Sequence, residues 1–341
     1  MVHLRIVAPR DSAEKALELL CASDSVLNVV RLEGVSRKPE GDVILCDVAR
    51  EDASVIISDL KELDIPAQGS IAVEFVDTEI SDAAEAAERA APGLPSDAVI
   101  WEEVESRTEE DTELSVSFLA FMVLAMLIAA VGILIDQPIL IIAAMVLGPE
   151  FGPLAGVSVA AVERRGRLAR RSLAALAVGF PLGIVVTILA TLAFRATGLT
   201  PDDFSATDHP LTDFIARPDF FSFFVAYIAG TAGVLSLTST KSGALIGVLI
   251  SVTTIPAAAN GGVAAAYGEW GEFGGAASQL ALNLSAIMLA GVATLYVQRR
   301  YYLARRRRHL RDPARRAAGL PLGRSRRGPM VIKGVPEERP R

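Results

Sequence analysis

The sequence predicts an α+β protein, in which a small soluble βαββαβ domain precedes a polytopic α-helical membrane domain of six spans. The first 80 residues alternate apolar and polar positions in short β-rich runs. From residue 116 onward, several uncharged apolar runs approach the roughly 20 residues that a helix needs to cross a bilayer. Charge is also segregated, because residues 1–115 carry 27 acidic and 10 basic side chains, whereas residues 298–341 carry 3 acidic and 15 basic ones.

The soluble domain is expected over residues 1–80. Strands are predicted at 2–8, 26–32, 42–48 and 70–76, and helices with apolar positions at helical spacing at 12–21 and 52–63. The order βαββαβ is that of the split βαβ, or ferredoxin-like, arrangement. Domains of this type often regulate or dimerise other domains, so we expect a cytoplasmic regulatory or oligomerisation module.

An acidic linker or stalk is predicted over residues 81–115. A short helix at 82–91 ends at Pro92-Gly93-Leu94-Pro95, and residues 102–113 are densely acidic. These carboxylates could coordinate cations, but a solvated acidic face is the preferred interpretation.

Six membrane spans are predicted within residues 116–297. They cover residues 116–135, 138–162, 172–194, 220–238, 243–266 and 276–297, with a kink expected at Pro181 in the third. Five arginines in 164–171 place that loop in the cytoplasm by the positive-inside rule. Six spans then put both termini inside and the loops 195–222 and 267–275 outside. The start of the chain has no signal-peptide pattern, so the first span is expected to direct insertion into a bacterial inner membrane.

The tail, residues 298–341, is the most basic part of the chain. It could bind nucleic acid, but a helix that continues from the sixth span and lies against anionic lipid headgroups explains the same arginines more simply. Beyond Asp312 the tail is rich in Pro, Gly and Arg and is predicted to be disordered.

Two of the spans are interrupted. The second contains Gly148-Pro149-Glu150-Phe151-Gly152-Pro153, and the fifth is expected to break across residues 256–262. Each break falls in the middle of a set of three spans, so the two sets would be inverted relative to each other. Paired interruptions of this kind point to a transporter binding site, because unwound backbone is tolerated at membrane depth only inside protein or around a polar cavity.

Glu150 is the ionisable residue nearest the middle of a predicted span, where a charge is costly and usually functional. It could carry a proton, bind a cation or pair with a buried base such as Lys241, although a lysine at a span end can also snorkel to the interface. The breaks could instead mediate tight packing, as the small residues Gly243 and Gly247 would. We prefer a site, with these candidates: Gly148, Pro149, Glu150, Gly152, Pro153, Thr253, Thr254, Pro256, Asn260, Gly261 and Asn283, with Gln279 as a further uncharged ligand.

Enzyme motifs do not compete with this interpretation. The sequence has no P-loop, no GxGxxG after a strand, and no HExxH or CxxC pair, and its histidines lie in separate regions. We therefore expect no catalytic residues, no metal site and no cofactor.

The run Ile141-Ile142-Ala143-Ala144-Met145-Val146-Leu147-Gly148-Pro149-Glu150-Phe151-Gly152-Pro153 resembles the membrane block of the prokaryotic "domain of unknown function 389" proteins. Residues 244–262 and the run Leu282-Asn283-Leu284-Ser285-Ala286-Ile287 are similar to later blocks of that family, so the resemblance covers about residues 100–300. Glu150 departs from the family pattern, which favours an apolar or small residue there. The resemblance implies a polytopic bacterial membrane protein.

Two functions follow as hypotheses. The first is a transporter or channel-like protein for a small solute or ion, with its site between the breaks and with the soluble domain gating or assembling a homo-oligomer. The alternative is a membrane-anchored sensor or scaffold, whose soluble domain binds a ligand or a partner protein. Lipid handling at the headgroup level is not separated from these by sequence.

Overall fold

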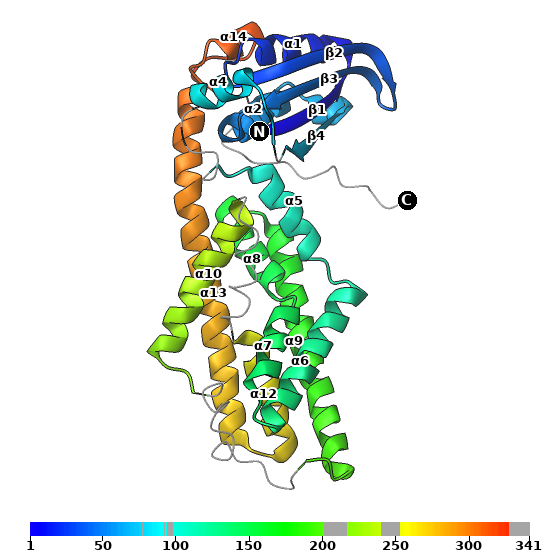
Figure 1. Cartoon of the computed structure of the whole chain (residues 1–341), viewed down its shortest axis with the longest axis vertical. Helices are drawn as coiled ribbons and strands as arrows, with labels where there is room; N and C mark the ends of the chain where they lie inside the picture. Colours follow the sequence, from blue (N-terminus) through cyan, green and yellow to red (C-terminus); the bar gives the residue numbers. More distant parts are fainter. Residues whose placement is uncertain (77, 92, 94–97, 201–216, 240–252, 327–341) are drawn as a thin grey trace. The chain divides into compact units, whose positions relative to one another are not determined.

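The protein is described by a computed structural model, which describes residues 1–76, 78–91, 93, 98–200, 217–239 and 253–326. The chain divides into two compact units (Figure 1). Unit 1 comprises Met1–Glu102 and Arg299–Arg341, and unit 2 comprises Glu103–Gln298.

Unit 1 is built on a small antiparallel sheet. Its strands are β1 (Val2–Ala8), β2 (Val26–Arg37), β3 (Glu40–Val48) and β4 (Ser70–Phe75), in the order β2-β3-β1-β4, and all neighbours are antiparallel. The helices between them are α1 (Arg10–Cys21), α2 (Arg50–Glu62) and the short α3 (Ile65–Gln68). The predicted mixture of two helices with a small sheet is confirmed, and β2 extends five residues beyond its predicted end.

One face of this sheet forms the core of unit 1. Leu4 and Ile6 of β1 and Ile44 of β3 are fully buried. They pack against apolar side chains of α1 and α2, such as Leu20 and Ile56. Period-two alternation in the strands and helical spacing in α1 and α2 thus bury one face of each element. Helix α4 (Asp82–Ala90) lies over β2, where Ala84 and Ala87 cover Leu27.

Residues 299–326 form an ordered part of unit 1. They contain the end of helix α13 (Trp270–His309) and the short helix α14 (Ala314–Ala317). Ala314, Ala318 and Leu320 are at most 3% exposed and join the core formed by α1, α2 and the sheet. The prediction of disorder beyond Asp312 is therefore wrong for residues 313–326, because apolar side chains there reach a core that local composition does not reveal. Residues 327–341 lie outside the described part.

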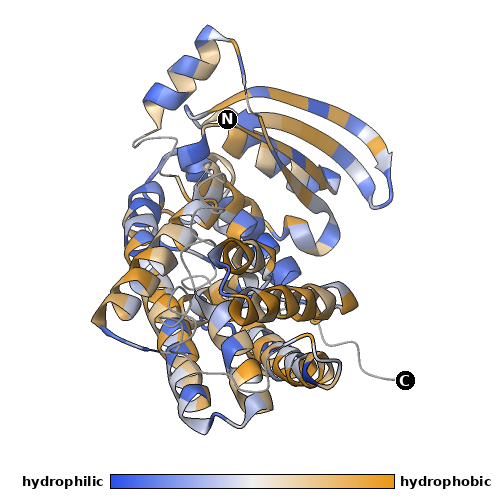
Figure 2. Cartoon of the chain, turned by 60° about the horizontal axis from the view of Figure 1, so that its bottom comes forward, coloured by the Kyte–Doolittle hydropathy of each residue, from blue (hydrophilic) through white to orange (hydrophobic). Residues whose placement is uncertain are grey.

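Unit 2 contains the apolar helices. Four are long and apolar enough to cross a membrane: α6 (Val116–Leu134), α9 (Gly166–Ala196), α10 (Phe220–Thr238) and α13. Helices α7 (Pro138–Leu147) and α8 (Phe151–Glu163) form a bent pair. If this pair counts as one span, the described residues contain up to five spans. Figure 2 shows apolar residues along much of the length of these helices. The remaining helices are α5 (Trp101–Asp111), which begins at the end of unit 1, and α12 (Thr254–Tyr267).

Helices α6 and α10 match the predicted first and fourth spans to within one residue, and α9 and α13 contain the predicted third and sixth spans and extend beyond them at both ends. The predicted basic loop at 164–171 is shorter than expected, because α9 begins at Gly166. Helix α9 also continues through Pro181. Residues 243–252 of the predicted fifth span, which include Gly243 and Gly247, lie outside the described residues, as does Lys241. The described residues hold up to five of the six predicted spans.

Glycines let the helices of unit 2 approach closely. A Cβ added at Gly230 of α10 would lie 2.8 Å from the Cα of Ile287 in α13. One added at Gly262 of α12 would lie 2.8 Å from Cγ2 of Thr187 in α9. Both distances are too short for a real Cβ, so these positions depend on glycine for packing.

Candidate functional site

The first predicted break lies where the sequence places it. Helix α7 ends at Leu147 and α8 starts at Phe151, and their axes differ by 49°. Pro149 favours an extended conformation at the preceding residue, and Gly148 has φ −64° and ψ 128°. Pro153 falls in the first turn of α8, where a missing N–H does no harm. The interruption therefore covers only residues 148–150.

Glu150 is enclosed at this break. It is 4% exposed, and its Oε1 accepts a hydrogen bond of 2.6 Å from the Thr254 hydroxyl. Its Oε2 is buried and has no hydrogen-bond partner. Among the described residues no basic side chain is paired with Glu150, and the base suggested from sequence, Lys241, lies outside them.

Helix α12 begins directly beside Glu150. Thr253 is its N-cap and Thr254 its first residue, so the partly positive end of the helix lies at the carboxyl group. The Asn283 side chain of α13 donates to the Thr253 hydroxyl at 2.8 Å, and Gln279 donates to Asn283 at 3.4 Å. Five predicted polar candidates are thus brought together: Glu150, Thr253, Thr254, Gln279 and Asn283.

The second predicted break does not lie at the residues where the sequence placed it. Residues 256–262 lie inside the continuous helix α12. Pro256 occupies its first turn, where proline is compatible with a helix, and Gly262 allows contact with Thr187 of α9. The helix start at Thr254, rather than an unwound segment at Pro256, is what meets Glu150.

The remaining candidates lie apart from the Glu150 carboxyl group. Gly152 packs against α5, because an added Cβ would lie 2.7 Å from the Cβ of Asp111. Gly261 has only ordinary contacts, the nearest at 3.8 Å from Ala276. Asn260 is 3% exposed and donates to Glu272 of α13 at 3.0 Å. Glu272 was predicted only as part of an acidic loop, but it lies in the first turn of α13. The spacing of seven residues between Glu272 and Gln279 could have indicated that both lie on one face of a helix.

The acidic segment at 102–113 forms most of α5. Its Glu105 and Glu109 pair with Arg165, the residue before α9. Among the described residues, no group of three or more His, Cys, Asp or Glu side chains could hold a metal ion. In the described chain, the acidic segment supplies ion pairs in each unit, because Glu102 pairs with Lys61 of unit 1 at 2.9 Å.

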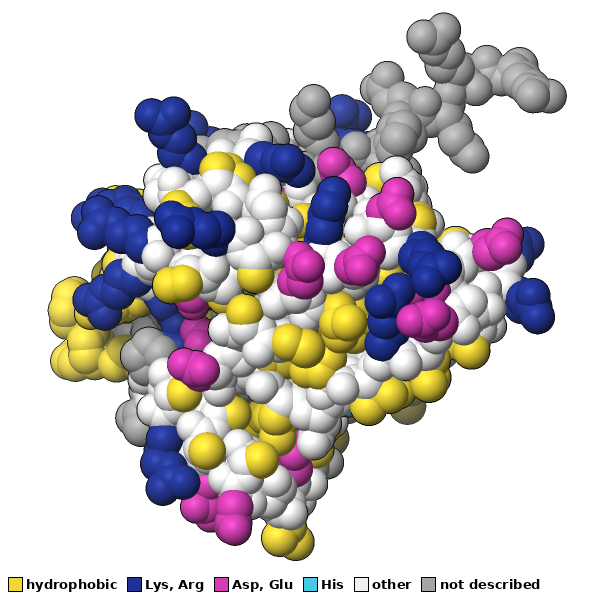
Figure 3. All heavy atoms as spheres, turned by 90° about the horizontal axis from the view of Figure 1, so that it is seen from above, with side chains coloured by type: hydrophobic (Ala, Val, Ile, Leu, Met, Phe, Trp, Pro, Cys, Tyr) yellow, Lys and Arg dark blue, Asp and Glu magenta, His cyan; other side chains and the backbone are white. Residues whose placement is uncertain are grey.

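The basic tail has two kinds of arginine. Figure 3 shows Lys and Arg side chains grouped at the surface of the face seen from above. Arg307, Arg308, Arg311 and Arg316 are exposed, whereas Arg306 and Arg315 are 8% and 0% exposed. The buried pair belongs to an ionic cluster that sequence reasoning missed.

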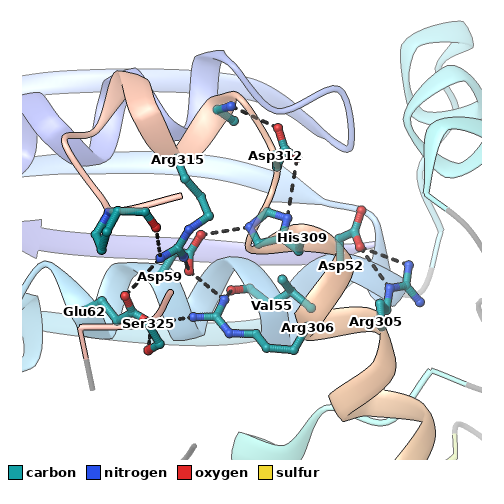
Figure 4. Close-up of polar contacts among 12 residues, drawn as sticks. Asp52, Val55, Asp59, Glu62, Arg305, Arg306, His309, Asp312, Arg315 and Ser325 are labelled. Atoms are coloured by element: carbon teal, nitrogen blue, oxygen red, sulfur yellow. Dashed lines mark hydrogen bonds and ion pairs between the residues drawn. The ribbon is translucent and has the colours of Figure 1, made fainter. Parts of the chain in front are cut away.

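This cluster joins the tail to α2 (Figure 4). Asp59 is fully buried and is bound by Arg306 at 2.6 Å, by Arg315 and by His309 at 2.8 Å. Glu62 is bound by Arg306 at 2.7 Å and by Arg315 at 3.1 Å. Burial opposes the charge of Asp59, but the hydrogen bond from His309 and the two guanidinium charges hold its pKa below the ordinary 3.8.

Comparisons with known proteins found similarity in the part of the chain that contains Glu150. A family model described as "Domain of unknown function (DUF389)" matches residues 145–289. The uncharacterized protein MJ0678 of Methanocaldococcus jannaschii is 28% identical over 196 residues, which are 56% of this chain and 58% of that protein, less than two thirds of its length. No solved structure matches the chain. The matched segment contains the break, α12 and Asn283.

Proposed function

We propose, from the premise that residues 145–289 are a DUF389 domain, that the protein is an integral membrane transporter or channel-like protein for a small solute or ion. The site is the Glu150 group, formed by the α7–α8 break, the start of α12 and Asn283 of α13. The N-terminal domain regulates or assembles the membrane domain.

The observation that carries this proposal is the state of the Glu150 side chain. A carboxylate in an apolar helical domain is costly unless it is neutralised, and such residues usually mark ion pathways or proton relays. Glu150 has one hydroxyl donor and one oxygen with no partner. A proton or a bound cation would neutralise it, and exchange of either would connect the site to transport.

The helix ends around the site support the same proposal. In transporters, interrupted helices present their ends to substrates and coupling ions near the bilayer midplane. Here α8 starts one residue after Glu150, and α12 starts at the residue that donates to it. A shift of either half-helix would change the ligands of the carboxyl group.

The topology that goes with this function has six spans in two inverted halves, with both termini in the cytoplasm of a bacterial inner membrane. The four long helices and the bent pair support five of these spans, and α12 would be the second half of the remaining one. The arginines at the start of α9 and in the tail would face the cytoplasm by the positive-inside rule.

The soluble domain and the tail would serve the membrane domain. The strand order β2-β3-β1-β4 with antiparallel neighbours supports a ferredoxin-like domain that regulates or assembles a homo-oligomer. The exposed arginines of the tail, such as Arg307 and Arg311, would contact anionic lipid headgroups and not nucleic acid. We propose no enzymatic activity and no cofactor.

The test is ion flux in proteoliposomes that contain the full chain. Proton flux is followed with an entrapped pH dye, and Na⁺ and K⁺ flux with ion-sensitive dyes. Glu150→Gln keeps the shape of the side chain but cannot be charged, and we expect flux to fall to background. Glu269→Gln changes an exposed carboxylate and should leave flux unchanged. Unchanged flux in Glu150→Gln would remove Glu150 from the mechanism.

A membrane-anchored sensor or scaffold remains the second candidate, and the closed packing of the site favours it. Thr254 and Ile255 are fully buried against the break. Thr254→Cys distinguishes the two candidates, because a transporter must open its site to water at some stage. Labelling of this cysteine by a small water-soluble thiol reagent would support transport, and complete protection during ion gradients would support a scaffold.

A further inference from the structure

Helix α13 carries a row of polar side chains on one face. Glu272, Gln279 and Asn283 are spaced by seven and four residues, so they lie on the same side of the helix. Gln279 and Asn283 are 2% and 1% exposed, and Glu272 is half-buried. The row therefore runs from a partly exposed carboxylate into the buried interior of unit 2.

Helix α12 meets this row with polar side chains of its own. Asn260 donates to Glu272 at 3.0 Å, and Thr253 accepts from Asn283 at 2.8 Å. Next to the Asn260 contact, Gly261 lies beside Ala276. The two helices are thus antiparallel and meet at these two contacts. The inner contact, at Thr253, adjoins Thr254, which donates to Glu150 and ends the row.

The atoms without partners in this row are oxygens. The amide nitrogens of Asn260, Gln279 and Asn283 and the Thr254 hydroxyl donate within the row. Gln279 Oε1 and Glu150 Oε2 are buried and accept no hydrogen bond. Vacant carbonyl and carboxylate oxygens bind cations and not anions.

Packing alone explains this row less well. Hydrogen bonds between membrane helices contribute about 0.6–2 kcal/mol each, which accounts for the contacts of Asn260 and Asn283. It does not account for a carboxylate at each end of the row or for the two buried oxygens left vacant, because unpaired polar groups weaken helix association.

The length of the row fits a half-membrane distance. Eleven residues separate Glu272 from Asn283, which corresponds to about 16 Å along a helix. This is roughly half of the about 30 Å hydrocarbon thickness of a bilayer. A path of this length would connect one membrane surface with a site near the midplane.

We infer that the α12–α13 row is the access path by which a monovalent cation, the proton included, moves between the membrane surface at Glu272 and the site at Glu150. Glu272 attracts the cation at the entrance, and the oxygens of Gln279 and Asn283 replace part of its hydration on the way. A single carboxylate at the inner end matches a single positive charge. This inference rests on the proposed function. It adds that the transported ion is a monovalent cation and that the α12–α13 row forms one half of the path across the membrane.

The experiment compares path variants with neighbours outside the path, using full-length protein in proteoliposomes and dyes for H⁺, Na⁺ and K⁺. Glu272→Gln removes the entrance charge, and Gln279→Leu removes the vacant amide oxygen. We expect each to lower flux of the transported ion about tenfold at low concentration, through a weaker apparent affinity. The controls Glu269→Gln and Ser278→Ala, both exposed positions, should match the wild type.

Gln279→Glu keeps an oxygen at the same place and should retain flux, which separates loss of the path from misfolding. Wild-type flux in Glu272→Gln and Gln279→Leu, together with loss in Glu150→Gln, would overturn the path and leave the proposed function standing. Absence of flux of all three ions in the wild type, or full flux in Glu150→Gln, would overturn both.

Discussion

Asp59 of unit 1 and Glu150 of unit 2 are both buried carboxyl groups on helices or helix ends, but their surroundings differ. Asp59 is fully buried and bound by Arg306, Arg315 and His309. Glu150 is 4% exposed and has one hydroxyl donor, Thr254. The first carboxylate is neutralised within the described chain, and the second depends on something that the described chain does not provide.

The difference in partners suggests different roles: Asp59 holds the tail to α2, whereas Glu150 can exchange a proton or a cation. A buried ion pair holds its parts in place because loss of one partner leaves the other charge stranded in a low dielectric. A buried carboxyl group without a base must take up a proton or a cation, and so its state depends on the solution.

The largest stability effect is expected for Arg315→Ala. Arg315 is fully buried and binds both Asp59 and Glu62, so its removal should destabilise unit 1 by about 3–5 kcal/mol. Thermal unfolding in detergent and proteolysis of the tail would measure this loss. Arg316→Ala is the matched control, because its exposed neighbouring side chain should change stability by at most about 0.5 kcal/mol. Equal effects of the two variants would contradict the account.

Acid should weaken the same cluster. The pKa of Asp59 is lower in the folded protein than its ordinary value of 3.8, so its ionisation contributes stability that is fully present above that value. This contribution is lost as the pH falls below 3.8 through the folded pKa. Unfolding of unit 1 should thus become easier as the pH falls below 3.8. Asp59→Asn should be less stable at pH 5 and less sensitive to acid, and an unchanged acid profile would contradict this.

Substitutions at two neighbouring glycines of α12 should change stability by smaller amounts, and Gly261 serves as the control for Gly262. Gly262→Ala places a Cβ too close to Thr187, and such overpacking typically destabilises by about 1–3 kcal/mol. Gly261→Ala meets only contacts of 3.8 Å or more, and replacement of a helical glycine should stabilise by up to about 1 kcal/mol. Unfolding midpoints of the two neighbours should therefore move in opposite directions. A shift in the same direction would contradict the α9–α12 contact.

Thr254→Val should have a mild effect on stability and a clear one on the site. The variant keeps the side-chain shape but removes the donor to Glu150, which is worth about 1 kcal/mol. We expect a small decrease of the unfolding midpoint and a change in the pH or cation dependence of flux. Thr231→Val, which loses a hydroxyl bond to the backbone of its own helix, serves as the control. Identical flux profiles for the two variants would separate Thr254 from the site.

Local patterns predicted much of this molecule. Apolar length predicted α6 and α10 nearly to the residue, and Gly148-Pro149 predicted the end of α7, because these signals act on neighbouring residues. The location of Pro256 within α12 could not be predicted, since the same residue breaks a helix in its middle and starts one in its first turn.

Contacts between distant segments were also beyond prediction. The pairing of Arg306 and Arg315 with α2 joins residues about 250 positions apart, and composition alone assigned these arginines to lipid. The meeting of Glu150 with Thr254 was expected only as a general proximity of two breaks. Which donor reaches the carboxyl group depends on the register of α12, which no sequence pattern sets.

Glu150 has no basic partner among the described residues, and the unfolding midpoint of Glu150→Gln is the measurement that tests whether the carboxyl group depends on one. The account predicts that this variant is as stable as the wild type, within about 0.5 kcal/mol, while Asp59→Asn in the same measurement is destabilised by about 3 kcal/mol or more. A loss of stability in Glu150→Gln as large as that in Asp59→Asn would show that Glu150 is held as an ion pair, and would contradict the account.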